Sequence, residues 1–291
     1  SMKHWKPAAI AALWSGALYA APMPVVASFS ILGDVAQQIG GERVGVQNLV
    51  GANQDAHAYN LTSGDIKKIR EARLVLLNGL GLEKAELQRA VKQSKVASAE
   101  ATAGIKPLAA DEHHHEHGHD HDHDHGEFDP HVWNDPVLMQ RYAANVAIAL
   151  IKADPAGSRY YQQRFKDYQN VLNQLNNYAN QQFGAVAPAK RKVLTGHDSF
   201  AYLGKRYQVK FISPQGVSSE AEPSARQIAA IIRQIKAENV KAVFTENIKD
   251  GRMIARIAKE TGVKVSGGLY ADALSSGAPA GTYADMFRYN V

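Results

Sequence analysis

The sequence predicts an α/β protein of two lobes, each with a central, mostly parallel sheet flanked by helices, joined by one long linking helix. Three observations lead to this fold class. The chain has 291 residues, more than one compact core usually holds. Short β-rich runs alternate with helical runs in two separate stretches, as in parallel sheets covered by helices. A single long amphipathic pattern lies between these stretches, and a 45% hydrophobic content fits a globular protein.

The first element, residues 1–21, is predicted to be a secretory signal peptide. Basic Lys3 and Lys6 precede an apolar run at 8–19, and small residues follow at 20–21. The run is too short to span a bilayer, and the alternative is a buried amphipathic first helix. The chain has no cysteine, which excludes disulfides, thiolate ligands and a lipid on cysteine. We therefore expect a protein free in the periplasm.

The N-terminal α/β lobe is predicted at 22–136. Its β-rich runs and the helical runs between them are, in order, strands at 25–29, 44–50, 74–78 and 96–98 and helices at 31–39, 62–71 and 82–93. Alternation of this kind predicts a parallel sheet with helices on its faces.

A linking helical segment is predicted at 137–187. Apolar residues recur there at steps of four and three: Tyr161, Phe165, Tyr168, Leu172, Leu175 and Ala179. Residues 156–183 would form one helix about 42 Å long, at 1.5 Å per residue, whose apolar stripe is packing core. Such a stiff helix would permit only small movements of the lobes.

The C-terminal α/β lobe is predicted at 188–291. Its runs repeat the rhythm of the first lobe, with strands at 192–195, 209–212, 242–245 and 263–265 and helices at 200–206, 224–238 and 251–261. Ser224, with Gln227 three residues later, is typical of a helix start.

The charge balance gives no sign of a nucleic-acid partner. The formal net charge is +5. Removal of residues 1–21 takes two lysines, so that 31 basic residues face 28 acidic ones and +3 remains. A charge this small, without an obvious basic patch, does not indicate nucleic-acid binding.

Histidines are the most informative residues of this chain. Eight of the twelve lie close together at 113–125, whereas His57, His131 and His197 are solitary and lie in small-residue, turn-like contexts. Three imidazoles and one carboxylate suit Zn²⁺ better than Mn²⁺, which prefers more oxygen ligands. The sequence therefore predicts one zinc site with Asp272 as the fourth ligand; the other carboxylates that could take this place are Glu220, Glu222 and Asp285.

The positions of these residues support their convergence. His57, His197 and Asp272 each follow a predicted strand, and ligands of open α/β sheets gather beyond the carboxyl ends of strands. His131 lies between two prolines that restrict the backbone. Neutral imidazole is the form that binds metal, so affinity should fall as the pH drops through about 6.5.

From residue 25 to the end, the chain resembles the metal-specific solute receptors of ABC importers, in the zinc-binding (ZnuA/AztC-like, cluster A-I) branch. The resemblance rests on four segments: Asp-Pro-His-Val-Trp-Asn-Asp-Pro (129–136), Asp-Ala-His-Ala-Tyr (55–59), Thr-Gly-His-Asp-Ser-Phe-Ala-Tyr (195–202) and Leu-Tyr-Ala-Asp-Ala-Leu-Ser (269–275). It implies two lobes, a connecting helix and one metal between them. Manganese receptors of the superfamily tend to have glutamate where His197 stands. Some zinc receptors have a cysteine pair and lack the aspartate ligand, so this chain resembles the AztC-like branch more.

The histidine-rich segment 111–126 contains no apolar residue, which predicts a disordered loop. Its histidines would bind further zinc weakly as an auxiliary metal loop: His113, His114, His115, His117, His119, His121, His123 and His125. The alternative is a solvated linker whose metal binding is incidental. The pattern H-E-x-x-H at 115–119 matches zinc proteases, but a glycine inside it disfavours the helix that such a site needs.

The predicted function is a periplasmic, high-affinity Zn²⁺ receptor that delivers its metal to the membrane permease of an ABC importer. We expect no catalytic residue and no enzymatic activity, since a carboxylate fills the position that water occupies in zinc hydrolases. Alternatives are a manganese receptor of the same family and an exported zinc-buffering or adhesin-like protein. A monomer is expected, and a periplasmic zinc chaperone is a further candidate partner. Trp133 could shield the metal or fill the core, and Asp198 and Glu222 could hydrogen-bond the ligand imidazoles.

Overall fold

The computed structural model describes residues 21–110 and 127–291. The N-terminal half contains β1 (Met23–Phe29), α1 (Ser30–Gly40), β2 (Val44–Val50), α2 (Ser63–Glu71), β3 (Leu74–Leu77), α3 (Ala85–Ser94), β4 (Ala97–Glu100), the 3₁₀ turn η2 (Val132–Asn134) and α4 (Met139–Ala153). The remainder contains α5 (Ser158–Gly184), β5 (Lys192–Leu194), α6 (Ala201–Tyr207), β6 (Lys210–Ile212), α7 (Ala225–Glu238), β7 (Ala242–Glu246), α8 (Arg252–Thr261), β8 (Gly267–Leu269) and α9 (Tyr283–Asn290).

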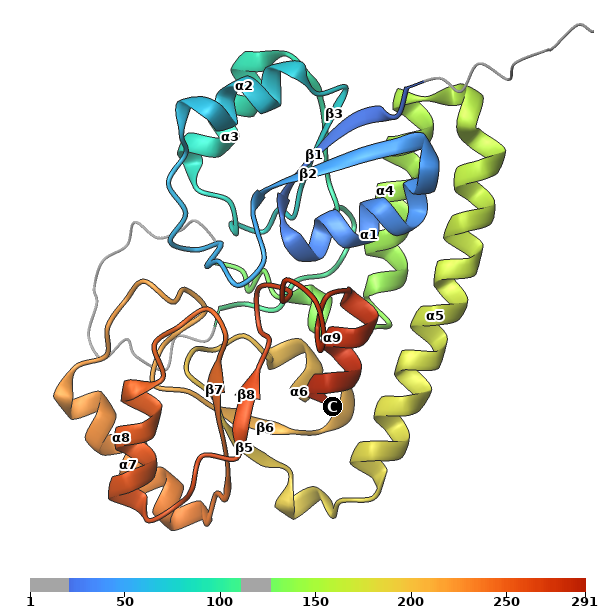
Figure 1. Cartoon of the computed structure of the whole chain (residues 1–291). Coiled ribbons are helices and arrows are strands. Elements are labelled where there is room, and N and C mark those ends of the chain that lie inside the picture. Colours follow the sequence, from blue (N-terminus) through green and yellow to red (C-terminus); the bar gives the residue numbers. More distant parts are fainter. Residues whose placement is uncertain (1–20, 111–126) are drawn as a thin grey trace, which may run out of the picture.

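The described residues form two four-stranded parallel sheets, one in each lobe. Their strand orders are β2-β1-β3-β4 and β6-β5-β7-β8, so the two lobes share one topology. In Figure 1 the lobes lie one above the other, and α5 runs along one side of both. This confirms the predicted α/β class with two lobes and one long linking helix.

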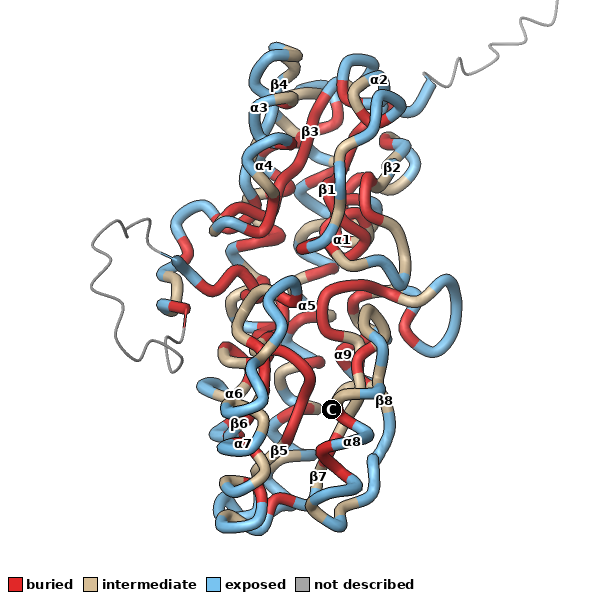
Figure 2. The backbone as a smooth tube through the Cα atoms, turned by 90° about the vertical axis from the view of Figure 1, so that its left-hand side faces the viewer, coloured by how far each residue is buried: buried red, intermediate tan, exposed pale blue. Residues whose placement is uncertain are grey.

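The core is continuous across the two lobes. One hydrophobic cluster contains residues of β1, α1, α4, α5, α6 and α9, including Leu172 and Leu175 of α5. Two smaller clusters lie at the far ends of the molecule, one beneath α2 and α3 and the other beneath α7 and α8. Figure 2 shows the buried chain extending from β1 and α1 through the junction of the lobes. The predicted stripe on α5 is thus packing core.

Local signals explain the starts of two helices, α2 and α7. At the start of α2, the hydroxyl of Thr62 accepts from Asp65 N at 3.1 Å, and the Asp65 carboxylate accepts from Thr62 N at 2.9 Å. Ser224 and Gln227 form the same reciprocal pair before α7, as predicted.

Within the described residues, no helix is both long and apolar enough to cross a bilayer.

One predicted strand is wrong, and one helix was not predicted. Residues 263–265 lie outside any strand because Gly262 ends α8 in the left-handed region and Val263 N still donates to the helix at Ala258 O (3.0 Å). The fourth strand of this sheet is β8, three residues of low strand propensity held by parallel pairing with β7. Helix α9 is short, and its Thr282 cap was not recognised.

Candidate metal centre

Four side chains from distant parts of the chain meet where the lobes join: His57, His131, His197 and Asp272. One potential ligand atom from each lies within 4.8 Å of all the others. His57 follows β2, His131 precedes η2, His197 follows β5, and Asp272 follows β8. Each lobe therefore supplies two, and all four are buried, with exposed fractions of 7% for His57 and 0% for the rest.

The distances between these atoms fit a small cation with several ligands. The Asp272 Oδ2 atom lies 2.6 Å from Nε2 of His57, 3.0 Å from Nε2 of His197 and 3.3 Å from Nε2 of His131. The Nε2 atoms of His57 and His131 are 3.2 Å apart. Ligands about 2.0–2.1 Å from a tetrahedral zinc are separated by about 3.3 Å, so these atoms could enclose such an ion after small shifts.

The second oxygen of Asp272 supports an ion at this place. Oδ1 is buried and has no hydrogen-bond partner among residues 21–110 and 127–291, although it lies 3.3 Å from Nε2 of His131. A buried carboxylate oxygen without a hydrogen bond is costly, and a cation would compensate it. This oxygen could also provide a fifth ligand.

Two of the imidazoles are held by carboxylates on their far side. The Nδ1 atom of His131 lies 2.7 Å from Asp129 Oδ1, and Nδ1 of His197 lies 2.6 Å from Glu246 Oε2. The same carboxylates accept from the backbone N–H groups of these histidines, at 2.9 Å and 3.3 Å. With Nδ1 donating, each Nε2 lone pair is directed at the site, an arrangement typical of metal-binding histidines.

The charges of the site favour a divalent cation. Burial alone would lower the pKa of His131, but the Asp272 and Asp129 carboxylates outweigh it and raise this pKa to about 10. At His197, burial would again lower the pKa. The carboxylates of Glu246 and Asp272 outweigh this effect and raise the pKa of His197 well above its usual value. Burial would raise the pKa of Asp272, but the histidines lower it well below its usual range. Without metal the site therefore holds protons, which a cation would replace.

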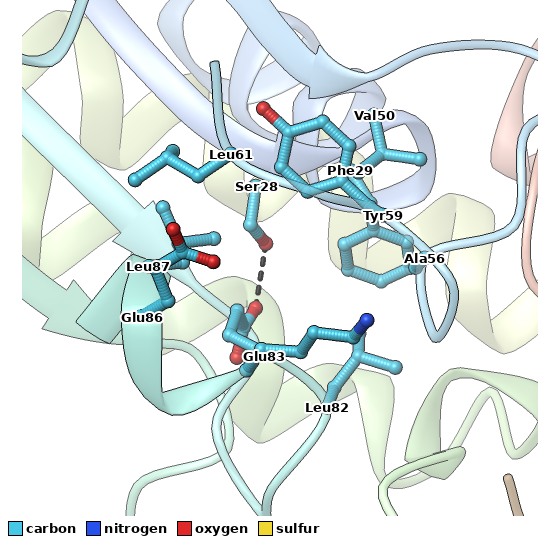
Figure 3. Close-up of a pocket in the computed structure, with 11 residues that line it drawn as sticks. Ser28, Phe29, Val50, Ala56, Tyr59, Leu61, Leu82, Glu83, Glu86 and Leu87 are labelled. Carbon is cyan, nitrogen blue, oxygen red and sulfur yellow. Dashed lines mark hydrogen bonds between the residues drawn. The ribbon is translucent and has the colours of Figure 1, made fainter. Parts of the chain in front are cut away.

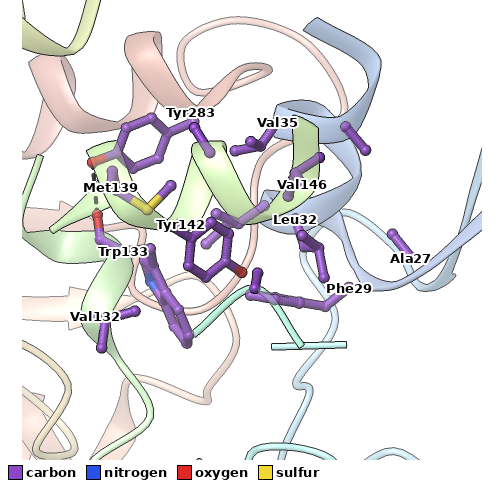
Figure 4. Close-up of a cluster of buried hydrophobic side chains, with 14 of the residues drawn as sticks. Ala27, Phe29, Leu32, Val35, Val132, Trp133, Met139, Tyr142, Val146 and Tyr283 are labelled. Carbon is purple, nitrogen blue, oxygen red and sulfur yellow. Dashed lines mark hydrogen bonds between the residues drawn. The ribbon is translucent and has the colours of Figure 1, made fainter. Parts of the chain in front are cut away.

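Aromatic packing closes the site on the side of His131. The Trp133 ring is fully buried, stands edge-on to the His131 ring at 5.1 Å and contacts Phe29 at 5.0 Å. Its Nε1 donates to Ala271 O at 2.8 Å, next to Asp272, while Tyr283 Oη donates to Trp133 O at 2.6 Å (Figure 4). Trp133 thus fills the core and packs on a candidate ligand.

A small cavity lies behind the loop that carries His57. Ala56 and Tyr59 line it together with Ser28 and Glu83 (Figure 3), and its volume of about 10 Å³ is near the minimum that can hold one water molecule. Ser28 donates to Glu83 at 2.6 Å, and burial raises the pKa of that carboxyl. None of the four candidate ligands lines this cavity, so it is not the metal centre.

Comparison with known proteins identifies the family. The model of ZnuA, "Zinc-uptake complex component A periplasmic", matches residues 25–291. The chain belongs to the ZnuA family. The manganese-binding lipoprotein MntA of Bacillus subtilis is 32% identical over 279 residues, covering 92% of this chain and 87% of that protein.

Two solved structures agree with the fold. The periplasmic zinc binding protein TroA of Treponema pallidum superposes with a TM-score of 0.84 at 26% identity, covering 92% of this chain and 96% of its own. A manganese-bound periplasmic metal binding protein of Candidatus Liberibacter asiaticus gives a TM-score of 0.80 at 29% identity with the same coverage. Members of the ZnuA family are metal-binding receptors of ABC importers and not enzymes, and this chain shares that class of function.

The structure brings together all four residues that the sequence singled out. The other carboxylates considered, Glu220, Glu222 and Asp285, are exposed on the surface. Asp129 and Glu246 are partners of the imidazoles that the sequence did not predict. The Asp-Pro-His motif places Asp129 two residues before its histidine, so the sequence could have indicated this pair. Glu246 is 49 residues from His197, and no sequence pattern connects the two residues. The predicted auxiliary histidines at 113–125 lie outside the described residues.

Proposed function

We propose that this protein is a periplasmic zinc receptor that binds one Zn²⁺ through His57, His131, His197 and Asp272 and delivers it to the permease of an ABC importer. The observation that supports zinc most is the composition of the site: three imidazole nitrogens and one carboxylate. Zinc accepts such a set in four-coordinate geometry, while manganese prefers more oxygen. The full set of protein ligands suits capture and transport better than hydrolysis.

Manganese is the second candidate, for two reasons. Several relatives, MntA of Bacillus subtilis among them, carry manganese in their names. In addition, the unbonded Oδ1 of Asp272 could bind as a second oxygen and raise the coordination number to five. The imidazole at position 197 favours zinc against this alternative.

Competition calorimetry tests the proposed metal. Purified, metal-free protein without residues 111–126 is titrated with Zn²⁺ and Mn²⁺ separately, and then with Zn²⁺ in the presence of excess Mn²⁺. We expect one site per chain, with zinc bound at least a hundredfold more tightly. Equal or tighter binding of Mn²⁺ would refute the zinc assignment and leave the manganese alternative.

The cellular part of the proposal needs separate tests. Mass spectrometry of the protein from a periplasmic fraction should show a chain shortened by residues 1–21. Loss of the gene should reduce ⁶⁵Zn uptake at low zinc. No such reduction is expected if the protein is a purely buffering or adhesin-like protein. A zinc chaperone as partner, a monomeric state, the lobe limits at 22–136, 137–187 and 188–291, and zinc binding by the histidine-rich loop stay predictions.

A further inference from the structure

A hydrogen bond between the lobes lies next to the candidate metal centre. The hydroxyl of Ser219, in the loop between β6 and α7, donates to Oδ2 of Asp55, in the loop after β2. Ser219 is 5% exposed, so water competes little for this contact. The contact thus joins the two lobes directly.

Asp55 also holds a proposed metal ligand in place. Its Oδ1 atom accepts from the backbone N–H of His57 at 2.9 Å. One carboxylate therefore connects the segment that carries His57 to the opposite lobe. Because carboxylates are strong acceptors, both hydrogen bonds are stronger than those between neutral groups.

The Ser219 loop is in turn attached to the other histidine segment. Gln215 pairs with His197 in an isolated parallel bridge, and its carbonyl accepts from Asp198 N at 3.0 Å. The Lys249 ammonium donates to Ser219 O at 2.9 Å and to the Gln215 side chain. A short path of contacts thus leads from His197 through Gln215, Ser219 and Asp55 to His57.

We propose that the Ser219–Asp55 hydrogen bond is a latch that slows metal release by holding the His57 loop against the C-terminal lobe. Ser219 and Lys249 are positioning residues, since neither belongs to the proposed ligand set. This bond must break before the His57 loop can move away from the opposite lobe, so it lowers the rate of dissociation more than it changes that of association. The inference rests on the proposed function only in requiring a metal at the interlobe site.

Stopped-flow measurement of zinc release to an excess of chelator tests this latch. Ser219→Ala should release zinc about tenfold faster, the factor expected for the loss of one hydrogen bond to a charged group, while association is unchanged. Ser219→Thr, which keeps the hydroxyl, should restore slow release. Lys249→Met should make zinc release about threefold faster. This variant also tests the latch if Ser219→Ala does not fold.

A neighbouring contact provides the matched control. Lys84 forms an ion pair with Glu220 at 3.0 Å across the same interface, but the two side chains are 35% and 49% exposed and neither belongs to the proposed ligand set. Lys84→Met should change release less than twofold. The melting temperature of the metal-free protein should change little in all variants, which separates positioning from a general loss of stability.

Two results would overturn the latch: wild-type release rates in both Ser219→Ala and Lys249→Met, or equal acceleration in Lys84→Met. A failure of the proposed zinc function is distinguishable from either. If the wild type binds Mn²⁺ instead of Zn²⁺, the same variants are compared for Mn²⁺ release, and the same two results decide.

Discussion

The two lobes have the same sheet order but hold their histidines differently. In the N-terminal lobe, β1 and β2 have seven residues each, and the carboxylate behind His131 is Asp129, two residues earlier in the chain. In the C-terminal lobe, β5 and β6 have three residues each, and the carboxylate behind His197 is Glu246, at the end of β7. The first histidine is therefore oriented by its own segment, while the second depends on an assembled sheet.

The hydrophobic core has a shared part and an outer part in each lobe. The large cluster contains residues of α4, α5, α6 and α9, whereas α7 and α8 pack on a separate small cluster that includes Ile257, and α2 and α3 pack on another that includes Leu87. We infer that these outer parts can unfold locally at lower cost than the shared core. The proposed metal centre lies beside the shared core, where His131 packs on Trp133.

Removal of a proposed ligand should reduce zinc affinity more than any other change. The reduction should be similar whether the ligand comes from one lobe or the other. His131→Ala and His197→Ala should each weaken zinc binding on the order of a hundredfold or more, since four-ligand sites gain about 10–16 kcal/mol in total. Asp285→Ala is the matched control, because this exposed carboxylate should leave the affinity unchanged. Competition with a chelator of known affinity measures all three, and near-wild-type binding by either histidine variant would refute the shared site.

Substitution of the carboxylate behind each imidazole should reduce zinc affinity by different factors in the two lobes. Asp129→Asn and Glu246→Gln should each reduce affinity about 10- to 100-fold. Each carboxylate accepts from the backbone N–H of its histidine, and we expect the larger loss for Glu246→Gln because Glu246 also accepts from Ser199 Oγ at 3.4 Å. Glu222→Gln, an exposed glutamate, serves as control. A larger loss for Asp129→Asn would reverse the comparison.

The pH dependence follows from the raised histidine pKa values. The carboxylates raise the pKa of His131 to about 10 and shift the pKa of His197 in the same direction. We therefore expect zinc to displace a proton from His131 at pH 7, so that affinity falls about tenfold for each unit of pH below about 10. The structure thus moves the onset above the value of about 6.5 expected from the sequence. Calorimetry in buffers of different ionisation enthalpy should detect proton release at pH 7; its absence would contradict these pKa values.

The contrast between the lobes also explains what sequence alone could predict. Strand and helix patterns are local, so β2 and the capped starts of α2 and α7 were predicted within a residue. The four candidate ligands were found because each lies in a distinctive loop. The strand β8 and the role of Glu246 depend on pairing and packing between distant segments, for which no local pattern exists. The convergence of the four candidate ligands was therefore better predicted than the contacts that support it.

Substitutions in the cores should change metal affinity least. Ile257→Ala, in the small cluster, should lower the free energy of unfolding by about 2–5 kcal/mol while changing zinc affinity less than about threefold. Leu172→Ala on α5 should destabilise both lobes to a similar degree. Hydrogen exchange distinguishes the two: faster exchange should be confined to α7 and α8 in the first variant and extend to both lobes in the second. Exchange that rises throughout the protein in Ile257→Ala would refute the independent outer cluster.

The most direct test of the metal centre is anomalous diffraction at the zinc absorption edge from zinc-loaded crystals of protein that lacks residues 111–126. We predict one strong peak between the lobes, about 2.0–2.1 Å from Nε2 of each solitary histidine and bonded to Asp272. A peak elsewhere, or none between His57, His131, His197 and Asp272, would contradict the account.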